Sequence, residues 1–496
     1  VFEEPLFPRE EAKPASSAQT PDGQLLAARA VANVFRSHLQ GENLRDIDSL
    51  AHMLHGVAHE SLNAHRSLAL ANRIASSLEK LSTHEEFPEE NIRSLMQICG
   101  SSEFFGEMIA SNPTLIRSLG HKTQESQRRE YRAILRAAIE RESSFSGELS
   151  SLRRAWSGLL VEIGVRDATG QIAVSESNRL QTELAVASIN AAYLIARREL
   201  SRRHGRIDGG PRLSFLGVGR LGTGGVDYGS DLDLIITYDS LLASPISSMS
   251  REQVNARLVE LMISALSSVT REGYLYRVDL RLRPNGQNGP LIVSTDGFLD
   301  YIRERSAIWE WLAYVKLRAV AGDLEVGRMV ETHARHLVHE NARKANPEEL
   351  KREARRVRDR LEREKTGHGR HGGLDIKYAA GGMLDVYFAL RYLQLRDDVP
   401  DQGEDRSTAS TLERLDSVGS IAPEDAAALG DGYALLRSVD HQLRMIVGRS
   451  ASLPALDHPA TWDIAVKLGF KSATDLNSVL SERMREIRNA YERILD

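Results

Sequence analysis

Two aspartates separated by a single residue are the first feature of this chain that could carry out chemistry. Asp231 and Asp233 lie in the run DLDLIITY at 231–238, whose β-branched and aliphatic residues predict a strand. Successive side chains of a strand point to opposite faces, so both carboxylates lie on one face while Leu232 and Leu234 point into the core. The sequence therefore predicts a pair of carboxylates on one surface.

A third carboxylate follows in a second predicted strand, YLYRVDLRLR at 274–283. Strand alternation places four charged side chains on one face of it: Arg277, Asp279, Arg281 and Arg283. If this strand lies beside the first, the three aspartates form a cluster of hard oxygen ligands that suits Mg²⁺ shared with substrate phosphates. Such a site can activate an attacking hydroxyl and stabilise a leaving pyrophosphate, with the arginines facing a triphosphate.

A glycine-dense turn, GVGRLGTGGVDYGS at 217–230, directly precedes the paired aspartates and ends in Gly229 and Ser230. Exposed backbone N–H groups in such a turn can bind phosphate oxygens. An isolated Asp-x-Asp string is common on solvated strand ends. The order of strand, glycine-rich turn, Gly-Ser, Asp-x-Asp and a later Asp among arginines instead favours nucleotide chemistry.

The elements that must position these residues form an α/β segment inside a helical protein. Apolar residues recur at helical spacing before and after this segment, whereas 206–330 contains the predicted strands 212–218, 231–238 and 274–283 and a helix at 251–271. We expect a linker or disordered arm at 1–24, an N-terminal helical domain at 25–205, an α/β catalytic domain at 206–330 and a C-terminal helical bundle at 331–496. The fold class is mostly α with an α/β core.

Composition excludes several classes of protein. Lys and Arg total 64 against 69 Asp and Glu, a net charge of −5, which gives no general attraction for nucleic acid or an anionic membrane. The single cysteine, Cys99, cannot form an intrachain disulfide, and no apolar run is long enough to span a membrane. We therefore expect a cytoplasmic protein without nucleic-acid or membrane partners, and the start at Val1 suggests a piece of a longer chain.

Together the segments resemble the nucleotidyltransferase superfamily and, more closely, the glutamine synthetase adenylyltransferase family. The resemblance is carried by FLGVGRLGTGGVDYGSDLDLIITYD, LYRVDLRLRPNGQNGPLIVS, IWEWLAYVKLRAVAGD and LDIKYAAGGMLDVYFALRYLQL, and it extends over nearly all of 25–496. It implies a polymerase-β-like mixed sheet flanked by helical bundles. It also implies transfer of AMP from ATP to a tyrosine of glutamine synthetase, with Mg²⁺ or alternatively Mn²⁺, in the control of nitrogen metabolism, and with the PII signal protein as a second partner.

The resemblance assigns roles to individual residues. Asp231, Asp233 and Asp279 bind the metal, and Asp279 is also the nearest candidate base. The nucleotide is contacted by Gly219, Arg220, Gly229, Ser230, Arg281, Arg283, Lys316 and Lys377. Asp375 and Asp385 are further candidates for reaching the nucleotide, although capping of a helix N-terminus explains them equally simply. Trp309 and Glu310 belong either to the active site or to a helix with its tryptophans in the core.

Family members carry two catalytic cassettes, of which the N-terminal one removes the adenylyl group by phosphorolysis and the C-terminal one adds it. The wording GSDLDL resembles the adenylylating cassette, with the deadenylylating one as the alternative. Two departures are visible: Arg220 replaces the usual lysine, and Tyr387 replaces the usual glutamate. The second keeps open a catalytically weakened regulatory paralogue, whereas the acidic charge disfavours a nucleic-acid or antibiotic nucleotidyltransferase.

Two further charged stretches have simpler explanations. The run KREARRVRDRLEREK occupies 351–365. With Leu350 just before it, the apolar residues Ala354, Val357 and Leu361 recur at helical spacing. This pattern predicts a solvated amphipathic helix rather than a nucleic-acid site. Three histidines recur at every third residue without the spacing of helical zinc ligands, and we expect them all at the surface: His333, His336 and His339.

Overall fold

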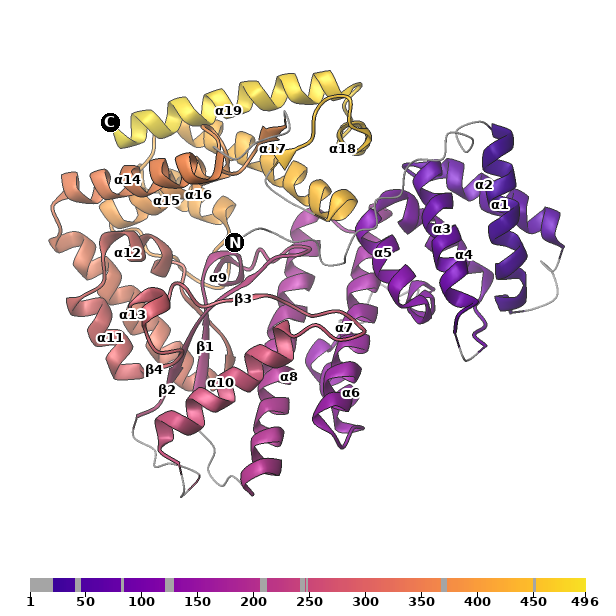
Figure 1. Ribbon diagram of the computed structural model, residues 1–496. Helices are drawn as coiled ribbons and strands as arrows, with labels where there is room; N and C mark the ends of the chain where they lie inside the picture. The colour runs from indigo at the N-terminus through magenta and orange to yellow at the C-terminus, as the bar shows by residue number, and fades with distance from the viewer. Residues whose placement is uncertain are drawn as a thin grey trace.

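A computed structural model describes residues 21–40, 46–81, 84–120, 129–205, 212–240, 246, 249–366, 373–448 and 452–496. Figure 1 shows the first helices as a lobe at one side of a larger body, which contains the sheet and is capped by the C-terminal helices. No helix in these ranges is long and apolar enough to cross a membrane.

The N-terminal third is helical, as predicted. Its helices are α1 (Pro21–Phe35), α2 (Ile47–Glu60), α3 (Ala64–Leu78), α4 (Glu89–Ser101), α5 (Glu103–Ser111), α6 (Tyr131–Glu140), α7 (Phe145–Ala168) and α8 (Val174–His204), with short 3₁₀ turns at Arg36–His38 and Pro113–Leu119. Because α1 begins at Pro21, the last residues of the predicted arm are helical, while 1–20 lie outside the described residues.

The sheet is mixed, as predicted. Its strands are β1 (Leu213–Gly217), β2 (Leu232–Tyr238), β3 (Val278–Asp279), β4 (Val293–Ser294) and β5 (Arg318–Gly322). The order is β3-β2-β1-β5, and β4 also pairs with β2. β1 runs antiparallel to β2 and β5, whereas β2 runs parallel to β3 and β4.

Both faces of the sheet are covered, which explains why β2 is buried almost continuously after its first residues. Leu234 and Ile236 belong to the core that includes α8 and α10 (Arg251–Ser267), whereas Ile235 belongs to the core that includes α13 (Leu324–Lys344). α8 packs against α10 and β5, so a helix from the predicted N-terminal domain covers the catalytic sheet. The predicted boundary at 330 falls inside α13.

The predicted strand at 274–283 is wrong in its extent, since only Val278 and Asp279 pair in the sheet. Pro284 cannot donate to a ladder, and Asn285 takes a left-handed conformation with φ 61°. The turn begins earlier, because the Asp279 side chain accepts the Arg281 N–H at 2.8 Å and the Leu280 backbone oxygen accepts the Arg283 N–H at 3.1 Å. Pro284 and Asn285 lead on into the 3₁₀ turn at Gly286–Asn288. The predicted helix at 251–271 likewise ends early, at Ser267, because Thr270 and Gly273 close a tight turn through two backbone hydrogen bonds.

The C-terminal part is helical apart from one two-stranded ribbon, β6 (Leu374–Asp375) with β7 (Ser452–Leu453). Its helices are α11 (Thr295–Glu304), α12 (Ile308–Tyr314), α14 (Pro347–Thr366), α15 (Met383–Arg396), α16 (Thr408–Ser417), α17 (Pro423–Val447), α18 (Pro459–Lys467) and α19 (Ala473–Leu495). Figure 1 shows α14 to α19 above the sheet.

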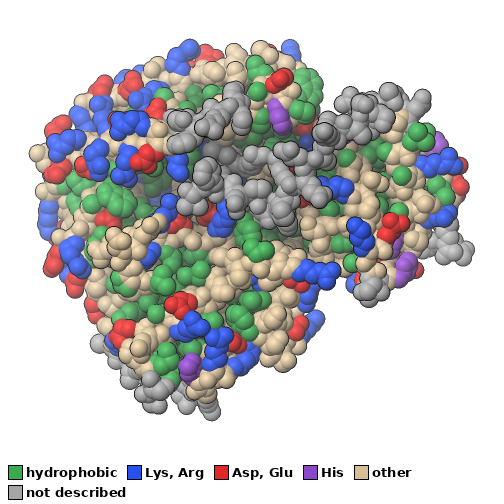
Figure 2. Space-filling view, in the orientation of Figure 1, with side chains coloured by type: hydrophobic (Ala, Val, Ile, Leu, Met, Phe, Trp, Pro, Cys, Tyr) green, Lys and Arg blue, Asp and Glu red, His purple; other side chains and the backbone are tan. Residues whose placement is uncertain are grey.

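Helix α14 is amphipathic, as predicted, with Leu350, Ala354 and Val357 buried. Its outer face carries ion pairs between neighbouring turns, such as Arg356 with Glu353 at 2.8 Å. On the face seen in Figure 2, Lys and Arg side chains are interspersed with Asp and Glu over the C-terminal helices. The charge run is thus largely a solvated helix face, but Arg358 within it is fully buried and pairs with Asp385.

The prediction that all three histidines of α13 lie at the surface is wrong for His339. His333 and His336 are exposed, but His339 is only 4% exposed and its Nδ1 lies 3.0 Å from Asp398 Oδ1. A carboxylate partner from the loop after α15 accounts for the difference, because it satisfies the ring nitrogen Nδ1, which would otherwise favour water.

The turn between β6 and α15 touches α19 so closely that one position requires glycine. Gly381 has φ +74°, and a Cβ there would lie 1.8 Å from the backbone oxygen of Met484. Gly403 has a similar φ of +68°, but a Cβ there would meet no atom within 4 Å. The two glycines separate the cost of a left-handed conformation from the cost of a steric collision.

We expect Gly381→Ala to destabilise the chain by clearly more than Gly403→Ala. The left-handed conformation alone costs an alanine roughly 1–2 kcal/mol, and only at Gly381 must the turn also move away from α19. Urea unfolding of the two variants measures the difference. Equal losses of stability would show that the contact with Met484 relaxes freely.

Candidate active site

Parallel pairing of β2 with β3 sets two of the three predicted aspartates opposite each other. The register pairs Leu232 with Val278 and Asp233 with Asp279. Asp231 is exposed at the start of β2, while Leu232 and Leu234 are fully buried. The prediction that the two strands are neighbours is confirmed, and the register places Asp233 and Asp279 on one face, while Asp231 precedes β2.

The three carboxylates act on one another electrostatically. Burial, followed by the negative charges of Asp279 and Asp231, raises the pKa of Asp233 to about 7. The charges of Lys377 and Arg281 work in the opposite direction. Lys377 comes from the turn after β6, so the C-terminal bundle supplies a cation to the carboxylates of the sheet.

Arg281 binds Asp279 directly. Its Nε donates to Oδ2 at 2.8 Å and to Oδ1 at 3.0 Å, and its backbone N–H donates to Oδ1 at 2.8 Å. Burial alone would raise the pKa of Asp279, but these hydrogen bonds hold it below its ordinary value. Asp279 is therefore a carboxylate, and the side chain of Arg281 is 62% exposed beside it.

The donor set suits a hard divalent cation, although the site is not preformed. Within the described ranges, no group of three or more His, Cys, Asp or Glu side chains is arranged to hold a metal ion. Asp279 is bound by Arg281, and Asp233 is destabilised as an anion by its two neighbours. Carboxylate oxygens and unbalanced negative charge at Asp233 both fit Mg²⁺ or Mn²⁺.

The glycine-rich turn lies against the carboxylate of Asp233. Gly219 has φ +55°, and a Cβ there would come within 2.3 Å of Asp233 Oδ2. The Val218 N–H donates to the Asp233 backbone oxygen at 3.1 Å. Only glycine lets the backbone approach the carboxylate this closely, so the turn and the acidic strand form one site.

The end of the turn is closed by a pair of hydrogen bonds between Asp227 and Ser230. The Asp227 N–H donates to Ser230 Oγ at 3.0 Å, and the Ser230 N–H donates to the Asp227 backbone oxygen at 3.0 Å. Gly229 is exposed, with φ +65°, whereas Ser230 is buried. The structure thus brings both predicted phosphate-contacting residues next to Asp231.

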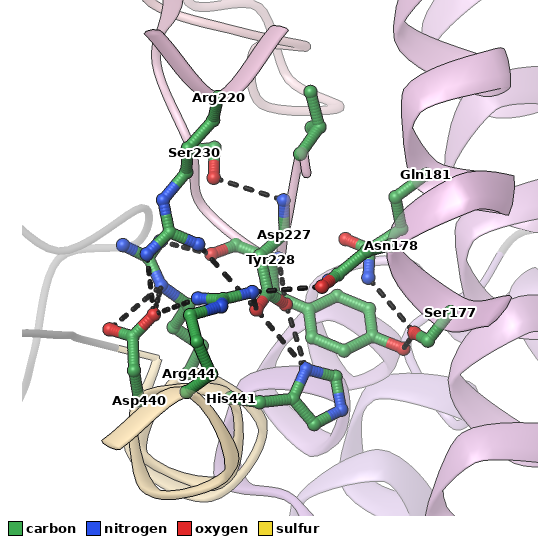
Figure 3. A network of polar contacts seen from close by, with 12 residues as sticks. Ser177, Asn178, Gln181, Arg220, Asp227, Tyr228, Ser230, Asp440, His441 and Arg444 are labelled. Atoms are coloured by element: carbon green, nitrogen blue, oxygen red, sulfur yellow. Dashed lines mark hydrogen bonds and ion pairs between the residues drawn. The ribbon is translucent and has the colours of Figure 1, made fainter. Parts of the chain in front are cut away.

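Arg220 and Arg283 are both engaged by other parts of the chain. Arg220 Nη2 donates to Asp440 Oδ2 in α17 at 2.6 Å, so its guanidinium is directed toward that helix (Figure 3). Arg283 donates to four backbone oxygens of its own turn, of which Leu280 is the nearest at 2.8 Å. Its charge still lowers the pKa of Asp279, so its predicted electrostatic role stays a prediction.

The structure does not bring Lys316 together with the aspartates. Lys316 is 1% exposed, and its Nζ lies 2.6 Å from Asp401 Oδ1 and also contacts Thr411. Burial, and then the nearby charge of Arg391, lower the pKa of this lysine to about 6. Lys316 thus anchors the segment between α15 and α16 in the interior.

Three other candidates have structural partners. Asp385 is fully buried in an ion pair with Arg358, and Asp375 Oδ1 accepts the backbone N–H groups of Lys377 and Tyr378. Glu310 in α12 accepts the Tyr301 hydroxyl at 2.8 Å. Asp375 closes a turn and Asp385 forms an interior ion pair, so these contacts are structural but differ from the predicted capping of a helix N-terminus.

Tyr387, where the resemblance implies a glutamate, lies within electrostatic range of Asp233. Burial raises the pKa of Tyr387, and the Asp233 charge raises it further against the effect of Arg391. The phenol donates to the Leu312 backbone oxygen at 3.2 Å, and Arg391 packs 4.8 Å above the ring. The substitution therefore sits at the candidate site.

Sequence reasoning missed a buried polar network beneath the glycine-rich turn (Figure 3). Its centre is His441, fully buried, with Nδ1 3.0 Å from Asp227 Oδ1 and Nε2 3.0 Å from Asp167 Oδ2. The signal in the sequence is the run RSVDHQLR at 437–444, where charged residues fall on the inward face of α17.

The two carboxylates determine the charge of His441. Burial alone would lower the pKa of the imidazole, but Asp227 and Asp167 overcome this effect and raise it to about 10. The pKa of Asp227 is correspondingly held well below its ordinary value, chiefly by His441 against the effect of burial. His441 is thus an imidazolium at neutral pH.

We expect the stabilisation from His441 to fall as the pH rises. Below about pH 6.5 the imidazole is protonated in both the folded and unfolded chain, so the contribution is complete. Above this value only the folded chain keeps the proton. The stabilisation therefore decreases progressively as the pH rises, up to about pH 10. Urea unfolding of wild type and His441→Gln should show a difference that shrinks toward high pH.

His339→Gln is the control for this measurement. Burial lowers the pKa of His339, so its stabilisation is lost as the pH falls, and the trend with pH is opposite. A difference between wild type and His441→Gln that stays constant with pH would contradict an imidazolium at this position.

The mixed sheet, with carboxylates on adjacent strands beneath a glycine-rich turn, is the arrangement of a nucleotidyltransferase catalytic domain. Residues 92–333 match the family model described as glutamate-ammonia ligase adenylyltransferase. Residues 355–495 match a second model, described as GlnD PII-uridylyltransferase. Residues 92–333 therefore belong to the glutamate-ammonia ligase adenylyltransferase family.

Curated relatives carry the name bifunctional glutamine synthetase adenylyltransferase/adenylyl-removing enzyme. The protein of Xanthobacter autotrophicus is 30% identical over 442 residues, which are 87% of this chain and 44% of the relative. That of Mesorhizobium japonicum is 32% identical over 67% of this chain and 33% of its own length. That of Pseudomonas syringae pv. tomato is 28% identical over 79% and 41%. The chain spans less than half the length of these relatives.

Proposed function

We propose that this chain transfers AMP from ATP to a tyrosine hydroxyl of glutamine synthetase and releases pyrophosphate. The observation that carries the proposal is the convergence of Asp231, Asp233 and Asp279 beside a turn whose Gly219 must lack a side chain. The names of the relatives supply the target protein. The reaction consumes ATP, which fits an enzyme of the cytoplasm.

The geometry divides the work among the residues of the site. The turn offers the triphosphate backbone N–H groups at Gly219 and Gly229, since most N–H groups between them donate within the chain. Lys377 and Arg281 are the cations that act on Asp233. The tyrosine oxygen attacks the α-phosphorus, the bond from that phosphorus to the α,β-bridging oxygen breaks, and Asp279 accepts the hydroxyl proton on a carboxylate oxygen. Mg²⁺ or Mn²⁺, when held by Asp231, Asp233 and Asp279, supplies Lewis-acid stabilisation of the phosphate charge.

Two finer points belong to the same proposal. We assign the adenylylating direction because the strand reads GSDLDL, although the reverse reaction by phosphorolysis uses the same carboxylates. In phosphorolysis, orthophosphate attacks the same phosphorus, the bond to the tyrosine oxygen breaks, and ADP is the product. We also place recognition of the PII signal protein in the C-terminal helices, supported by the match of 355–495 to a PII-uridylyltransferase model.

The decisive test incubates the chain with labelled ATP, Mg²⁺ and unmodified glutamine synthetase and follows label on the synthetase. We expect labelling by wild type, a rate at least about a hundredfold lower for Asp279→Asn, and no labelling by the Asp231→Ala, Asp233→Ala double variant. ADP release from adenylylated synthetase, dependent on phosphate, would assign the opposite direction. Neither activity would indicate a regulatory paralogue.

Lys377 and Lys316 give a sharper test of which lysine serves the nucleotide. Lys377 acts on Asp233 from a half-buried position, whereas Lys316 is paired with Asp401 in the interior. We expect Lys377→Ala to raise the KM for ATP about tenfold with little loss of stability, because one charge contact disappears. Lys316→Ala should lower the free energy of unfolding instead.

Steady-state kinetics and urea unfolding of both variants provide the comparison. An unchanged KM for ATP in Lys377→Ala would remove this residue from the nucleotide site.

A further inference from the structure

Helix α17 contacts the glycine-rich turn at both of its ends, through residues that have no role in the proposed reaction. Asp440 and His441 are consecutive residues of α17, and each contacts a different end of the turn. Asp440 Oδ2 accepts from Arg220 Nη2 at 2.6 Å, near the start. His441 Nδ1 lies 3.0 Å from Asp227 Oδ1, near the end.

A third contact comes from the next helical turn of α17. Arg444 Nη1 donates to the backbone oxygen of Tyr228 at 2.7 Å. Arg444 also donates to Asp440, which accepts from Arg437 as well. One face of α17 therefore binds a side chain at the start of the turn and both a side chain and a backbone oxygen at its end.

His441 also contacts α7, on the side of the imidazole ring opposite Asp227. Its Nε2 lies 3.0 Å from Asp167 Oδ2, and the same carboxylate accepts the Tyr228 hydroxyl at 2.8 Å. Ser177 in α8 also donates to Asp167. Figure 3 shows the imidazole between α17 and the turn, with Tyr228 and Ser177 beside it. The ring can leave Asp227 only by leaving Asp167 as well.

Burial makes these contacts obligatory. Asp227 is 1% exposed, and Asp440 and His441 are fully buried. Breaking a contact between buried charged groups is strongly unfavourable, even though Asp227 keeps Arg437 as a further partner, with Nη2 3.3 Å from its Oδ2. Conformations of the turn that break the pair are therefore scarcely populated, and the backbone N–H groups of 219–230 stay in a fixed relation to Asp233.

We propose that His441 is a positioning residue: by bridging Asp167 and Asp227, it fixes the turn 219–230 against the aspartates and so prepares it to bind the phosphates of a nucleoside triphosphate. The inference rests on the proposed function for the identity of the ligand, but its structural part can be measured without any turnover.

The test compares wild type, His441→Gln and the matched control His339→Gln, all as the full chain. His339 is also a buried histidine with a carboxylate partner, but it lies on α13 and pairs with Asp398, outside the turn. Hydrogen–deuterium exchange of 219–230 reports the order of the turn, and calorimetric titration with MgATP reports binding.

We expect His441→Gln to increase exchange in 219–230 and to weaken MgATP binding at least about fivefold. His339→Gln should leave both within about twofold of wild type. In the transfer assay, the KM for ATP should rise together with the dissociation constant for MgATP, while the KM for glutamine synthetase stays within about twofold of wild type. A merely structural role would lower kcat through loss of folded enzyme and leave both KM values unchanged.

A double-mutant cycle tests whether His441 acts through Asp227. Asp227→Asn alone should have a similar effect, and the combination with His441→Gln should be no worse than the more severe single variant, because both substitutions break the same contact. Additive losses would overturn the proposal. If His441→Gln does not fold, Asp227→Asn carries the same measurement from the side of the turn.

The outcomes separate this inference from the proposed function. Wild type that binds MgATP without labelling the synthetase contradicts the proposed function, while exchange and binding still decide the role of His441. Wild type that binds no MgATP overturns the ligand assignment. Wild-type exchange in the turn of His441→Gln, or equal changes in His339→Gln, overturns the positioning role.

Discussion

Parallel pairing between β2 and β3 is the constraint on which the rest of the site depends. The two strands share only two residue pairs, Leu232 with Val278 and Asp233 with Asp279, so a shift of one residue would place a carboxylate opposite an aliphatic side chain. Leu232 and Leu234 prevent such a shift, because they are fully buried and a slip would move them to the solvent side. The hydrophobic core thus fixes the position of the acidic side chains.

Charge is distributed around this pairing in two separate ways. Close to the sheet, Asp231, Asp233 and Asp279 leave a negative excess that Arg281 and Lys377 only partly offset. Beneath the turn, buried carboxylates and cations are paired almost completely, as with Arg220 and Asp440. The first arrangement is suited to bind a ligand that brings positive charge. The paired charges beneath the turn are suited to fix the backbone of 219–230.

The sequence was sufficient for features that depend on local patterns. Alternation along 231–238 predicted the orientation of Asp231 and Asp233, and helical spacing predicted α14. It failed where distant partners decide the outcome: Lys316 pairs with Asp401, and His339 pairs with Asp398. It also missed the end of the strand at Asp279, whose side chain accepts the Arg281 N–H and starts a turn. The partners of His441 could not be predicted for the same reason, since Asp167 and Asp227 are far from it along the chain.

This long separation has a consequence for how the protein is made. Domains generally fold from the N-terminus as the chain emerges from the ribosome, yet the turn that faces the candidate active site takes partners both before it, in α7 and α8, and long after it, in α17. A nascent chain that ends before residue 441 can form the strands of the sheet, but it lacks the helix that grips the turn. The turn therefore reaches all of its contacts only after α17 has left the ribosome, more than two hundred residues behind the turn itself.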